Sequence, residues 1–415
     1  MNPAPGKQGH LDPEAVDSAP GGNPEFESSP AAVQPSLPVP AGAASDPSAR
    51  SASRLSVSVI IPAYTIDRWS LIVKAVESVR TQSVVPEEIV VCVDNNDKLL
   101  ERARAEWSCA GTPPVRVMAN RSSNRFNGSE AHALAHGKTR RGGGSARNCA
   151  VETVTSDIVA FLDDDAWAEP DWLERLLSVH EGFPVVAVGG PPLPDYETQR
   201  PAWFPSSFDW VFGCAYEGLP KSTGPLRHLF GGNMAVRRGS FMALNGFQSI
   251  DFDSRSKPAA ARAPLDDLDL CMRLAHRFGA DSLYYEPRAV VHHYVPAERL
   301  SWRYFYRRCY FVNRRKAQTL RDIGPAANLA AELEFVWRTI TRCCLKDLRR
   351  GISGEPGAFR SLGATLIGIA LAGLGHLRGR LARPMRANSS SNPLALDLSG
   401  HRNEDSPIPL EGGDI

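Results

Sequence analysis

The sequence predicts an α/β protein with a mostly parallel central sheet flanked by helices and a helical extension at its C-terminal end. Apolar runs of strand length alternate with segments whose apolar residues recur at helical spacing, a pattern typical of parallel sheets. Polar side chains follow two of these runs directly, and ligands of open α/β sheets bind at the carboxyl ends of strands. With 415 residues, the chain is long enough for one large α/β domain with additions.

The first strand, helix and strand are expected between residues 57 and 93. The apolar run 57–61 should end at Pro62, because proline cannot donate to a sheet ladder. Apolar residues recur at helical spacing over 69–79, and the second apolar run, 88–93, ends in the polar sequence 94–97. Further strands are expected at 115–118, 158–162 and 185–188.

Three consecutive aspartates, Asp163, Asp164 and Asp165, follow the apolar run 158–162. Carboxylates grouped at the end of a buried strand repel one another unless a cation joins them. Mg²⁺ or Mn²⁺ suits such a site, because these ions take one or two carboxylates and complete their coordination with water and substrate phosphate. The alternative is a solvated turn, or a cap for the helix expected to begin near Asp171.

A glycine-rich turn at residues 142–144 leads through Arg147 into a helix expected over 149–154. Glycine lets a backbone approach an anion closely, the start of a helix offers free N–H groups, and the forked cation of Arg147 suits phosphate. We therefore expect a diphosphate to dock there. An ordinary flexible loop before a helix is the alternative.

Several motifs occur together in one order. They are Val57 to Tyr64, the strand end at Asp94, Gly-Ser-Ala-Arg-Asn at 144–148, Phe-Leu-Asp-Asp-Asp at 161–165, Gly-Gly-Asn-Met at 231–234 and Asp-Asp-Leu-Asp-Leu-Cys-Met-Arg-Leu at 266–274. Over about residues 57 to 317, this order resembles the family 2 glycosyltransferases, which have the GT-A nucleotide-sugar fold. The segment Trp203 to Cys214 is similar to a subgroup that includes transferases acting on lipid-linked sugars.

The resemblance implies inverting, metal-dependent transfer of a sugar from a nucleotide-diphosphate donor to a hydroxyl acceptor, on a lipid-linked or cell-envelope glycan. It assigns nucleotide-sugar binding to Pro62, Tyr64, Asp94, Arg147, Asp163 and Asp164. Within this set, Asp94 contacts the base and Arg147 lies near the diphosphate. Asp163 and Asp165 form an Asp-x-Asp element, in which one carboxylate touches the ribose and the other the divalent ion.

The resemblance also assigns a base, an acceptor side and a further metal ligand. Asp267 matches the second acid of a Glu-Asp pair and is the expected catalytic base. The acceptor-side residues are Gly232, Asn233, Met234 and Asp266. His293 matches a histidine near the metal, and the neighbouring His292 is almost as good a candidate.

Alternatives remain open for several of these residues. Asp267 equally suits the first turn of a helix, where acids are favoured, and Asn233 and Met234 suit a buried turn. The sequence departs from the family pattern at two motifs: Asp266 replaces the usual Glu of the acid pair, and Asn95-Asn96 replaces the common Asp-Gly-Ser. The identity of the donor sugar therefore stays open. A catalytically silent nucleotide-sugar or lipid-headgroup binding protein is the rival function, but a binding module needs no base.

Composition divides the chain into four expected parts. Residues 1–54 hold ten of the 33 prolines with much Ala, Gly and Ser, and should be disordered. Residues 55–300 form the catalytic domain, 301–385 a basic amphipathic extension, and 386–415 a second disordered tail. Eight scattered cysteines without paired spacing, in a chain with no export signal, indicate reduced thiols in the cytoplasm.

The extension predicts contact with a membrane surface. Residues 302–321 are basic and aromatic, and a helix with one apolar side is expected over 328–349. The uncharged segment 362–377 has only 16 residues, which favours an interfacial, re-entrant or buried helix over a crossing. We expect peripheral attachment to the inner face of the cell membrane, with packing on the catalytic domain as the alternative. No nucleic-acid partner is expected, because the basic patch is local and the pI is about 7.6.

Overall fold

The computed structural model describes residues 54–109, 111–120, 143–248, 266–323 and 336–382. The described residues all belong to one compact unit. Apart from Arg54, the tails expected at 1–54 and 386–415 lie outside the described residues. The boundary expected between 300 and 301 stays a prediction.

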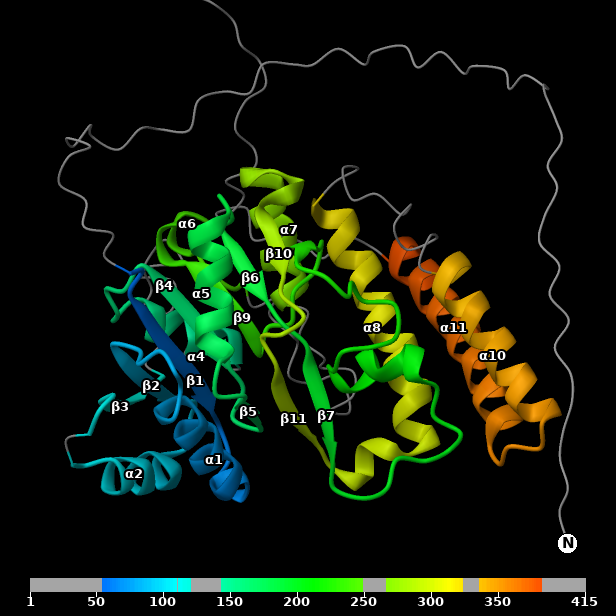
Figure 1. The fold of residues 1–415 in the computed structure, drawn as a ribbon, viewed down its shortest axis with the longest axis horizontal. Helices are drawn as coiled ribbons and strands as arrows, with labels where there is room; N and C mark the ends of the chain where they lie inside the picture. The colour runs from blue at the N-terminus through cyan, green and yellow to red at the C-terminus, as the bar shows by residue number, and fades with distance from the viewer. Residues whose placement is uncertain (1–53, 110, 121–142, 249–265, 324–335, 383–415) are drawn as a thin grey trace, which may run out of the picture. The chain divides into compact units, whose positions relative to one another are not determined.

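An eight-stranded sheet forms the centre of the described unit (Figure 1). Its order is β3 (Val115–Ala119), β2 (Glu88–Val93), β1 (Val57–Ala63), β4 (Ile158–Leu162), β9 (Asn233–Arg237), β6 (Ala187–Gly189), β10 (Leu283–Tyr285) and β8 (Gly224–Pro225). Pairing is parallel from β3 to β4 and between β6 and β10, whereas β9 runs antiparallel to both β4 and β6. The predicted α/β class is confirmed, with one reversed strand inside the sheet.

Helices cover both faces of this sheet (Figure 1). One face packs against α1 (Trp69–Arg80), α2 (Asp97–Glu106) and α5 (Trp172–Gly182), and the other against α4 (Gly143–Val151), α6 (Arg238–Ala243) and α7 (Asp266–Phe278). Side chains of β4 alternate between the two cores: Ala160 joins the first, and Val159 and Phe161 join the second. Burial on both faces explains why these strands are continuous apolar runs.

A second sheet orders the segment after the aspartates. It consists of β5 (Ala166–Ala168), β11 (Val291–Val295) and β7 (Pro192–Tyr196). The antiparallel pairing of β5 with β11 sets His293 opposite Ala166 and His292 opposite Trp167. Because successive side chains of a strand point to opposite faces, the two histidines face different surroundings.

Two expectations about local structure are wrong. The strand β1 continues through Pro62 to Ala63. Its pairing with β4 ends at Ile60 and only β2 pairs beyond that point, so Pro62 lies where one edge of β1 is free and proline is tolerated. The glycines expected in a turn are helical instead: Gly143 and Gly144 belong to α4, which ends at Val151. The strand expected at 185–188 is β6, which begins two residues later and ends one residue later than expected.

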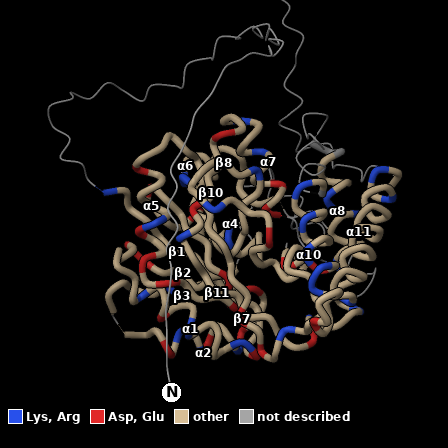
Figure 2. Tube along the Cα trace, turned by 45° about the vertical axis from the view of Figure 1, so that its right-hand side comes forward, with Lys and Arg blue, Asp and Glu red and all other residues tan. Residues whose placement is uncertain are grey.

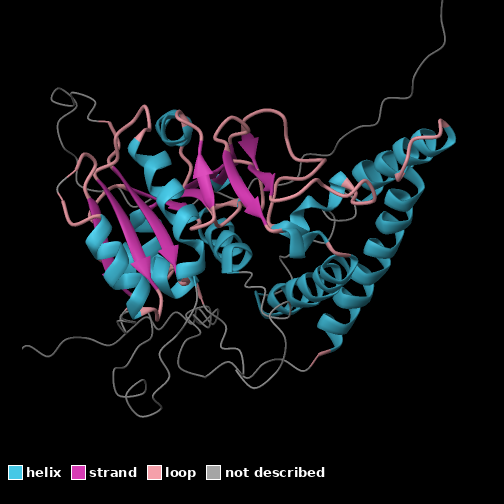
Figure 3. Cartoon of the chain, turned by 90° about the horizontal axis from the view of Figure 1, so that it is seen from below, coloured by secondary structure: helices cyan, strands magenta, loops and turns pink. Residues whose placement is uncertain are grey.

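The C-terminal helices lie beside the sheet (Figure 3). They are α8 (Trp302–Ile323), α10 (Thr341–Ile352), which follows one turn of π-helix, η7 (Val336–Ile340), and α11 (Ala358–Leu381). A third apolar core around Phe305 joins them to the short helix η3 (Ser206–Phe212), and Trp203 stacks on Trp302 with ring centroids 3.6 Å apart. Single 3-10 turns occur at η1 (Ile66–Arg68), η5 (Ala280–Ser282) and η6 (Ala297–Leu300).

These helices differ from the expected ones in their limits. Of the helix expected over 328–349, residues 328–335 lie outside the described chain, and α10 itself ends at Ile352. The uncharged segment 362–377 lies inside α11, which has 24 residues. Within the described chain, α11 is the helix that is long and apolar enough to cross a membrane, a test that some core helices of soluble proteins also pass.

Candidate active site

The antiparallel pairing of β4 with β9 brings two carboxylates to one peptide segment. Continuing that ladder by one residue sets Asp163 opposite Gly232, and a Cβ on Gly232 would clash with Asp163 Oδ2. A Cβ on Gly231 would lie 3.0 Å from Asp267 Cβ. The backbone of Gly231 and Gly232 thus lies between Asp163 and Asp267, a close approach that glycine permits.

Helix α4 supplies the cation on the Asp163 side. Arg147 Nη2 forms an ion pair with Asp163 Oδ1. The next residue, Asn148, fixes the helix by donating to Phe247 O at 2.7 Å and accepting from Phe247 N at 2.9 Å. Gly144 packs against Asp266, where a Cβ would lie 2.5 Å from the carboxylate oxygen. Glycine at this position thus lets α4 pack closely against Asp266, and Gly143 and Gly144 also line the cavity described below.

Asp164 and Asp165 are buried and share one guanidinium. Arg68 Nη1 lies 2.8 Å from Asp164 Oδ1 and 2.9 Å from Asp165 Oδ2. Burial, reinforced by the charge of Asp165, raises the pKa of Asp164 well above its ordinary range. Asp164 does not line the cavity described below, and its carboxylate binds Arg68; its predicted contact with the donor stays a prediction.

Asp163, Asp165 and His293 form a group that fits a divalent metal. Each offers one ligand atom, and these atoms lie within 4.8 Å of one another. His293 Nδ1 lies 3.0 Å from Tyr294 O, to which it donates, so Nε2 is the ring nitrogen that could bind a metal, and it lies 3.9 Å from Asp165 Oδ1. His292 lies elsewhere, with Nε2 2.6 Å from Glu169 Oε1 and its ring stacked on Trp167.

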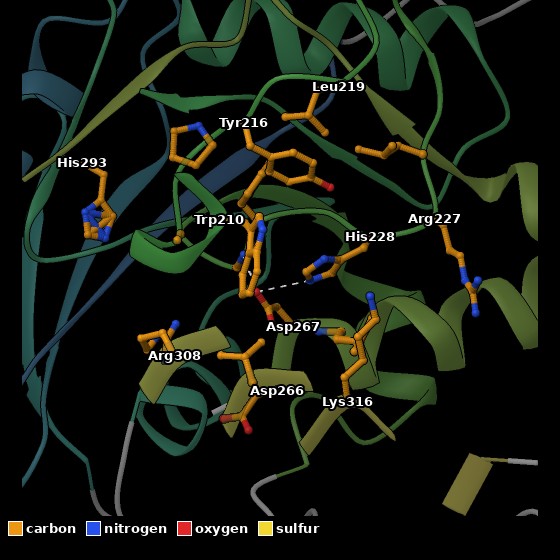
Figure 4. Close-up of a pocket in the computed structure, with 18 of the residues that line it drawn as sticks. Trp210, Tyr216, Leu219, Arg227, His228, Asp266, Asp267, His293, Arg308 and Lys316 are labelled. Atoms are coloured by element: carbon orange, nitrogen blue, oxygen red, sulfur yellow. Dashed lines mark hydrogen bonds and ion pairs between the residues drawn. The ribbon is translucent and has the colours of Figure 1, made fainter. Parts of the chain in front are cut away.

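On the other side of the glycines, Asp267 is held in its ionised form. Its Oδ2 lies 3.5 Å from His228 Nε2 and accepts from Gly231 N at 3.3 Å, while Oδ1 accepts from Leu268 N at 2.8 Å (Figure 4). Burial would raise the pKa of Asp267, but His228 and the two backbone N–H groups outweigh it and lower the pKa. Burial, and next the charge of Asp267, raises the pKa of Asp266 to about 7.

One cavity of about 690 Å³ connects these groups. Its polar lining on the sheet side consists of Arg147, Asp163, Asp266, Asp267 and His293, and Gly231 and Gly232 lie between them. The cavity then continues to the C-terminal helices, where it is lined by Arg308, Val312, Asn313 and Lys316 of α8, by Ile340, and by Ile369, Ala372, Gly373 and His376 of α11. Asp163, which is predicted to bind the donor, and Asp267, the predicted catalytic base, therefore line the same cavity.

Two of the residues predicted on the acceptor side do not reach this cavity. Asn233 is fully buried: its Oδ1 accepts from Trp172 Nε1 at 2.7 Å, and its Nδ2 donates to Ala289 O at 2.9 Å. Met234 is fully buried in the second core. As the first residues of β9 they lie inside the sheet, between β4 and β6, so the alternative of a buried structural role is the one observed.

Three other residues predicted to bind the nucleotide sugar, Pro62, Tyr64 and Asp94, lie at neighbouring strand ends, outside the cavity lining. Asp94 Oδ1 accepts from Asn95 and Asn120, each at 2.7 Å. Asn96 caps α2 by accepting from Leu99 N, and it donates to Tyr64 O at 3.1 Å, so it ties the end of β2 to the end of β1. The Tyr64 side chain is 52% exposed, whereas Pro62 is buried within β1.

Comparison with known proteins identifies the domain. Residues 58–244 match the model of glycosyl transferase family 2. This chain therefore contains a glycosyl transferase family 2 domain. The glycosyltransferase is 29% identical over 240 residues to glucosyl-dolichyl phosphate glucuronosyltransferase of Haloferax volcanii, a match that covers 58% of this chain and 69% of the relative. It is 30% identical to succinoglycan biosynthesis protein ExoM of Rhizobium meliloti, over 49% of this chain and 64% of that protein.

Solved structures include a similar chain. The mannosyltransferase PcManGT from Pyrobaculum calidifontis, in complex with GDP-Man and Mn²⁺, is 15% identical to the glycosyltransferase, with a TM-score of 0.47. The match covers 79% of this chain and 88% of that one.

Sequence reasoning missed two residues that hold the acids of the glycosyltransferase. His228 stands three residues before Gly231, an offset that the sequence displays, so an imidazole next to the glycine motif was a usable signal. Arg68 is 96 residues away from Asp164, and no local spacing connects them. Only the pairing of β1 with β4 reveals that η1 follows the strand beside the aspartates.

Proposed function

We propose that this glycosyltransferase moves a sugar from a nucleotide-diphosphate donor to an acceptor hydroxyl with inversion, and that it needs a divalent metal. One observation carries the proposal: Asp163 and Asp267 lie on opposite sides of the Gly231-Gly232 backbone and face the same cavity. This arrangement offers separate places for a leaving group and for an attacking hydroxyl within one enclosed space.

On the donor side, Arg147 and the acids would hold the diphosphate. Asp163, Asp165 and His293 would bind Mg²⁺ or Mn²⁺, which supplies positive charge for a leaving diphosphate when it is bound. Arg147 would place its guanidinium against phosphate oxygens from the Asp163 side. Arg68 balances the charge of Asp164 and Asp165, so that two buried carboxylates are tolerated beneath the site.

On the acceptor side, Asp267 would act as the base. Its lowered pKa keeps it ionised near neutral pH, ready to take a proton. His228 and the N–H groups of Gly231 and Leu268 fix the direction of the carboxylate. A hydroxyl that attacks from the Asp267 side would reach the sugar opposite the diphosphate and so would invert the anomeric centre.

The acceptor of the proposed reaction is a lipid-linked glycan at a membrane surface. The Haloferax relative is named for a glucosyl-dolichyl phosphate, and ExoM for succinoglycan biosynthesis. Large apolar side chains are exposed on the C-terminal helices at Leu345, Leu348 and Ile352 of α10 and at Phe359, Leu366, Ile367, Leu374, Leu377 and Leu381 of α11. Lysine and arginine residues lie along α8 and α10, whereas the middle of α11 contains neither (Figure 2). Such a surface suits an anionic membrane interface.

Calorimetry with nucleotide sugars tests the metal and the donor together. We expect binding that requires Mg²⁺ or Mn²⁺ and weakens by about tenfold or more in Asp165→Ala, because one of few charged ligands is lost. Asp171→Ala, an exposed acid at the start of α5, is the matched control. Tight binding that is insensitive to a chelator would remove the metal from the proposal, and a wild-type protein that binds but never turns over would favour the silent binding protein.

A further inference from the structure

The cavity extends well past the base, toward a face of α8. Arg308, Val312 and Lys316 are spaced four residues apart and therefore share one side of that helix. Arg227 and His228 line the cavity as well (Figure 4). This end of the cavity thus combines basic side chains with the apolar wall of α11, beyond Asp267.

Arg308 is the cation whose surroundings are most informative. Its Nε donates to Val211 O at 3.0 Å, and it forms no ion pair with any carboxylate of the described chain. Burial lowers the pKa of the Arg308 guanidinium, whereas the nearby Tyr304 and Asp267 oppose this shift. A partly buried guanidinium without a carboxylate partner is costly to keep charged, and an anion bound beside it would offset that cost.

Three of the nearby acids are already paired with other groups, and the fourth, Asp266, packs against Gly144 of α4. Asp163 pairs with Arg147, Asp165 with Arg68, and Asp267 with His228 and backbone N–H groups. The donor diphosphate has its own cation in Arg147, on the other side of the Gly231-Gly232 backbone. An anion at Arg308 would therefore belong to the acceptor.

Most of the residues that α11 and η7 contribute to the cavity lining are apolar, with His376 as the exception. Ile369, Ala372 and Gly373 of α11 and Ile340 of η7 line this end. The same helix carries exposed leucines on its outer side, at Leu366, Leu374 and Leu377. A hydrocarbon chain could thus pass along α11 from the cavity to the outer apolar surface. An acceptor that fits both features carries an anionic group and a hydrocarbon chain.

We propose that Arg308, with Lys316 on the same helix face, binds a phosphate carried by a lipid acceptor, while the wall formed by α11 and Ile340 holds the start of its hydrocarbon chain. This inference rests on the proposed function, since it places the acceptor hydroxyl next to Asp267. Arg308 and Lys316 would distinguish a lipid phosphate from an uncharged glycan, and the apolar wall would distinguish it from free phosphate.

Binding of simple probes to the full-length protein tests the proposal. We expect octyl phosphate, below its micelle concentration, to bind at least about tenfold more tightly than either 1-octanol or inorganic phosphate, because the subsite needs both parts. We also expect octyl phosphate to inhibit transfer without lowering the affinity for a nucleotide sugar. Equal binding of octyl phosphate and octanol, equal binding of inorganic phosphate, or displacement of the nucleotide sugar would each overturn the assignment.

A matched pair of variants on α8 locates the subsite. Arg308→Gln should weaken octyl phosphate binding by about tenfold to 100-fold, as expected for a lost charged hydrogen bond, and should leave nucleotide-sugar affinity unchanged. Arg303→Gln removes an exposed arginine of the same helix that does not line the cavity, and should change neither. Unchanged octyl phosphate binding in folded Arg308→Gln contradicts the proposal. If that variant does not fold, the wild-type probe comparison still decides.

The two proposals can fail separately. A wild-type protein that turns over no nucleotide sugar in the presence of metal would contradict the proposed function, whatever octyl phosphate does. Normal turnover without a preference for octyl phosphate would overturn the phosphate subsite alone.

Discussion

Asp266 and Asp267 are neighbours in the chain, yet their surroundings shift their pKa values in opposite directions. His228 and backbone N–H groups lower the pKa of Asp267, whereas burial and the charge of Asp267 raise that of Asp266 to about 7. Pairs of carboxyl groups separated in this way commonly divide their roles. The ionised member, Asp267, is the one suited to accept a proton.

The roles of the two acids are separable by isosteric substitution. Asp267→Asn keeps the shape of the side chain but cannot accept a proton, so transfer should fall by about 10² to 10⁴-fold while donor affinity persists. Asp266→Asn is the matched control and should retain most of the activity. Turnover and nucleotide-sugar affinity measured for both variants separate a base from a helix cap, because Asn caps a helix about as well as Asp. Near-normal transfer by Asp267→Asn would reject the mechanism.

Asp266 should also make the stability of the protein depend on pH. Because its pKa is higher in the folded chain than the ordinary 3.8, the folded chain holds more protons between about pH 4 and pH 7. The contribution of this group to the free energy of unfolding therefore falls as pH rises through that window, by up to about 2 kcal/mol after allowance for partial exposure. Melting temperatures at pH 5 and pH 8 should differ less in Asp266→Asn than in the wild type.

Asp267 affects the same window indirectly. Its own pKa is lowered, so its stabilising contribution is present above about pH 4 and is lost only below that value. Because its charge helps to raise the pKa of Asp266, Asp267→Asn should also reduce the difference between pH 5 and pH 8, but by less than Asp266→Asn does. The same difference in all three proteins would show that Asp266 does not titrate in this range.

At the scale of elements, α11 packs on α8 through glycines. A Cβ on Gly375 would clash with Tyr310 O, and one on Gly379 with Arg314 O, so the two helix backbones are in direct contact. By contrast, a Cβ on Gly363 would meet no atom within 4 Å. The same substitution should therefore have opposite effects at different points of one helix.

This contrast gives a direct stability test. Gly375→Ala should lower stability by about 1 to 3 kcal/mol because the added methyl forces the helices apart. Gly363→Ala should raise it by about 0.5 to 1 kcal/mol, since alanine is the better helix former and has space there. Thermal melts of the two variants in the same uncharged detergent make the comparison. Equal shifts would mean that α11 does not pack closely on α8.

Local patterns predicted the elements of the sheet but not the contacts that complete the site. The apolar runs ending at Leu162 and Val93 are visible in sequence because both faces of those strands are buried. The buried position of the Asn233 side chain was not predictable from its sequence neighbours, because its hydrogen-bond partners, Trp172 Nε1 and Ala289 O, belong to distant segments. The choice between His292 and His293 similarly depended on the register of β11 with β5.

At the scale of the whole molecule, the outer apolar surface of α10 and α11 predicts attachment to anionic vesicles. Leu366→Ser with Leu377→Ser, both exposed, should weaken vesicle binding by about tenfold or more, because each buried leucine contributes about 1.5 to 3 kcal/mol. Phe183→Ser changes a 43% exposed aromatic residue at the C-cap of α5, outside the C-terminal helices, and serves as the control. Flotation of full-length proteins measures the bound fraction. A wild-type protein that stays unbound at low salt would contradict attachment.

The reversed direction of β9 has a consequence for how two substrates can meet. Because β9 runs against β4, its entry point and the exit of β4 fall on one rim of the sheet. If β9 ran the other way, its five residues would carry Gly231 and Gly232 to the opposite rim, about 17 Å from the aspartates. The direction of one strand thus determines that Asp163 and Asp267, which we propose for donor and acceptor, are separated by the thickness of one peptide instead of by the width of the sheet.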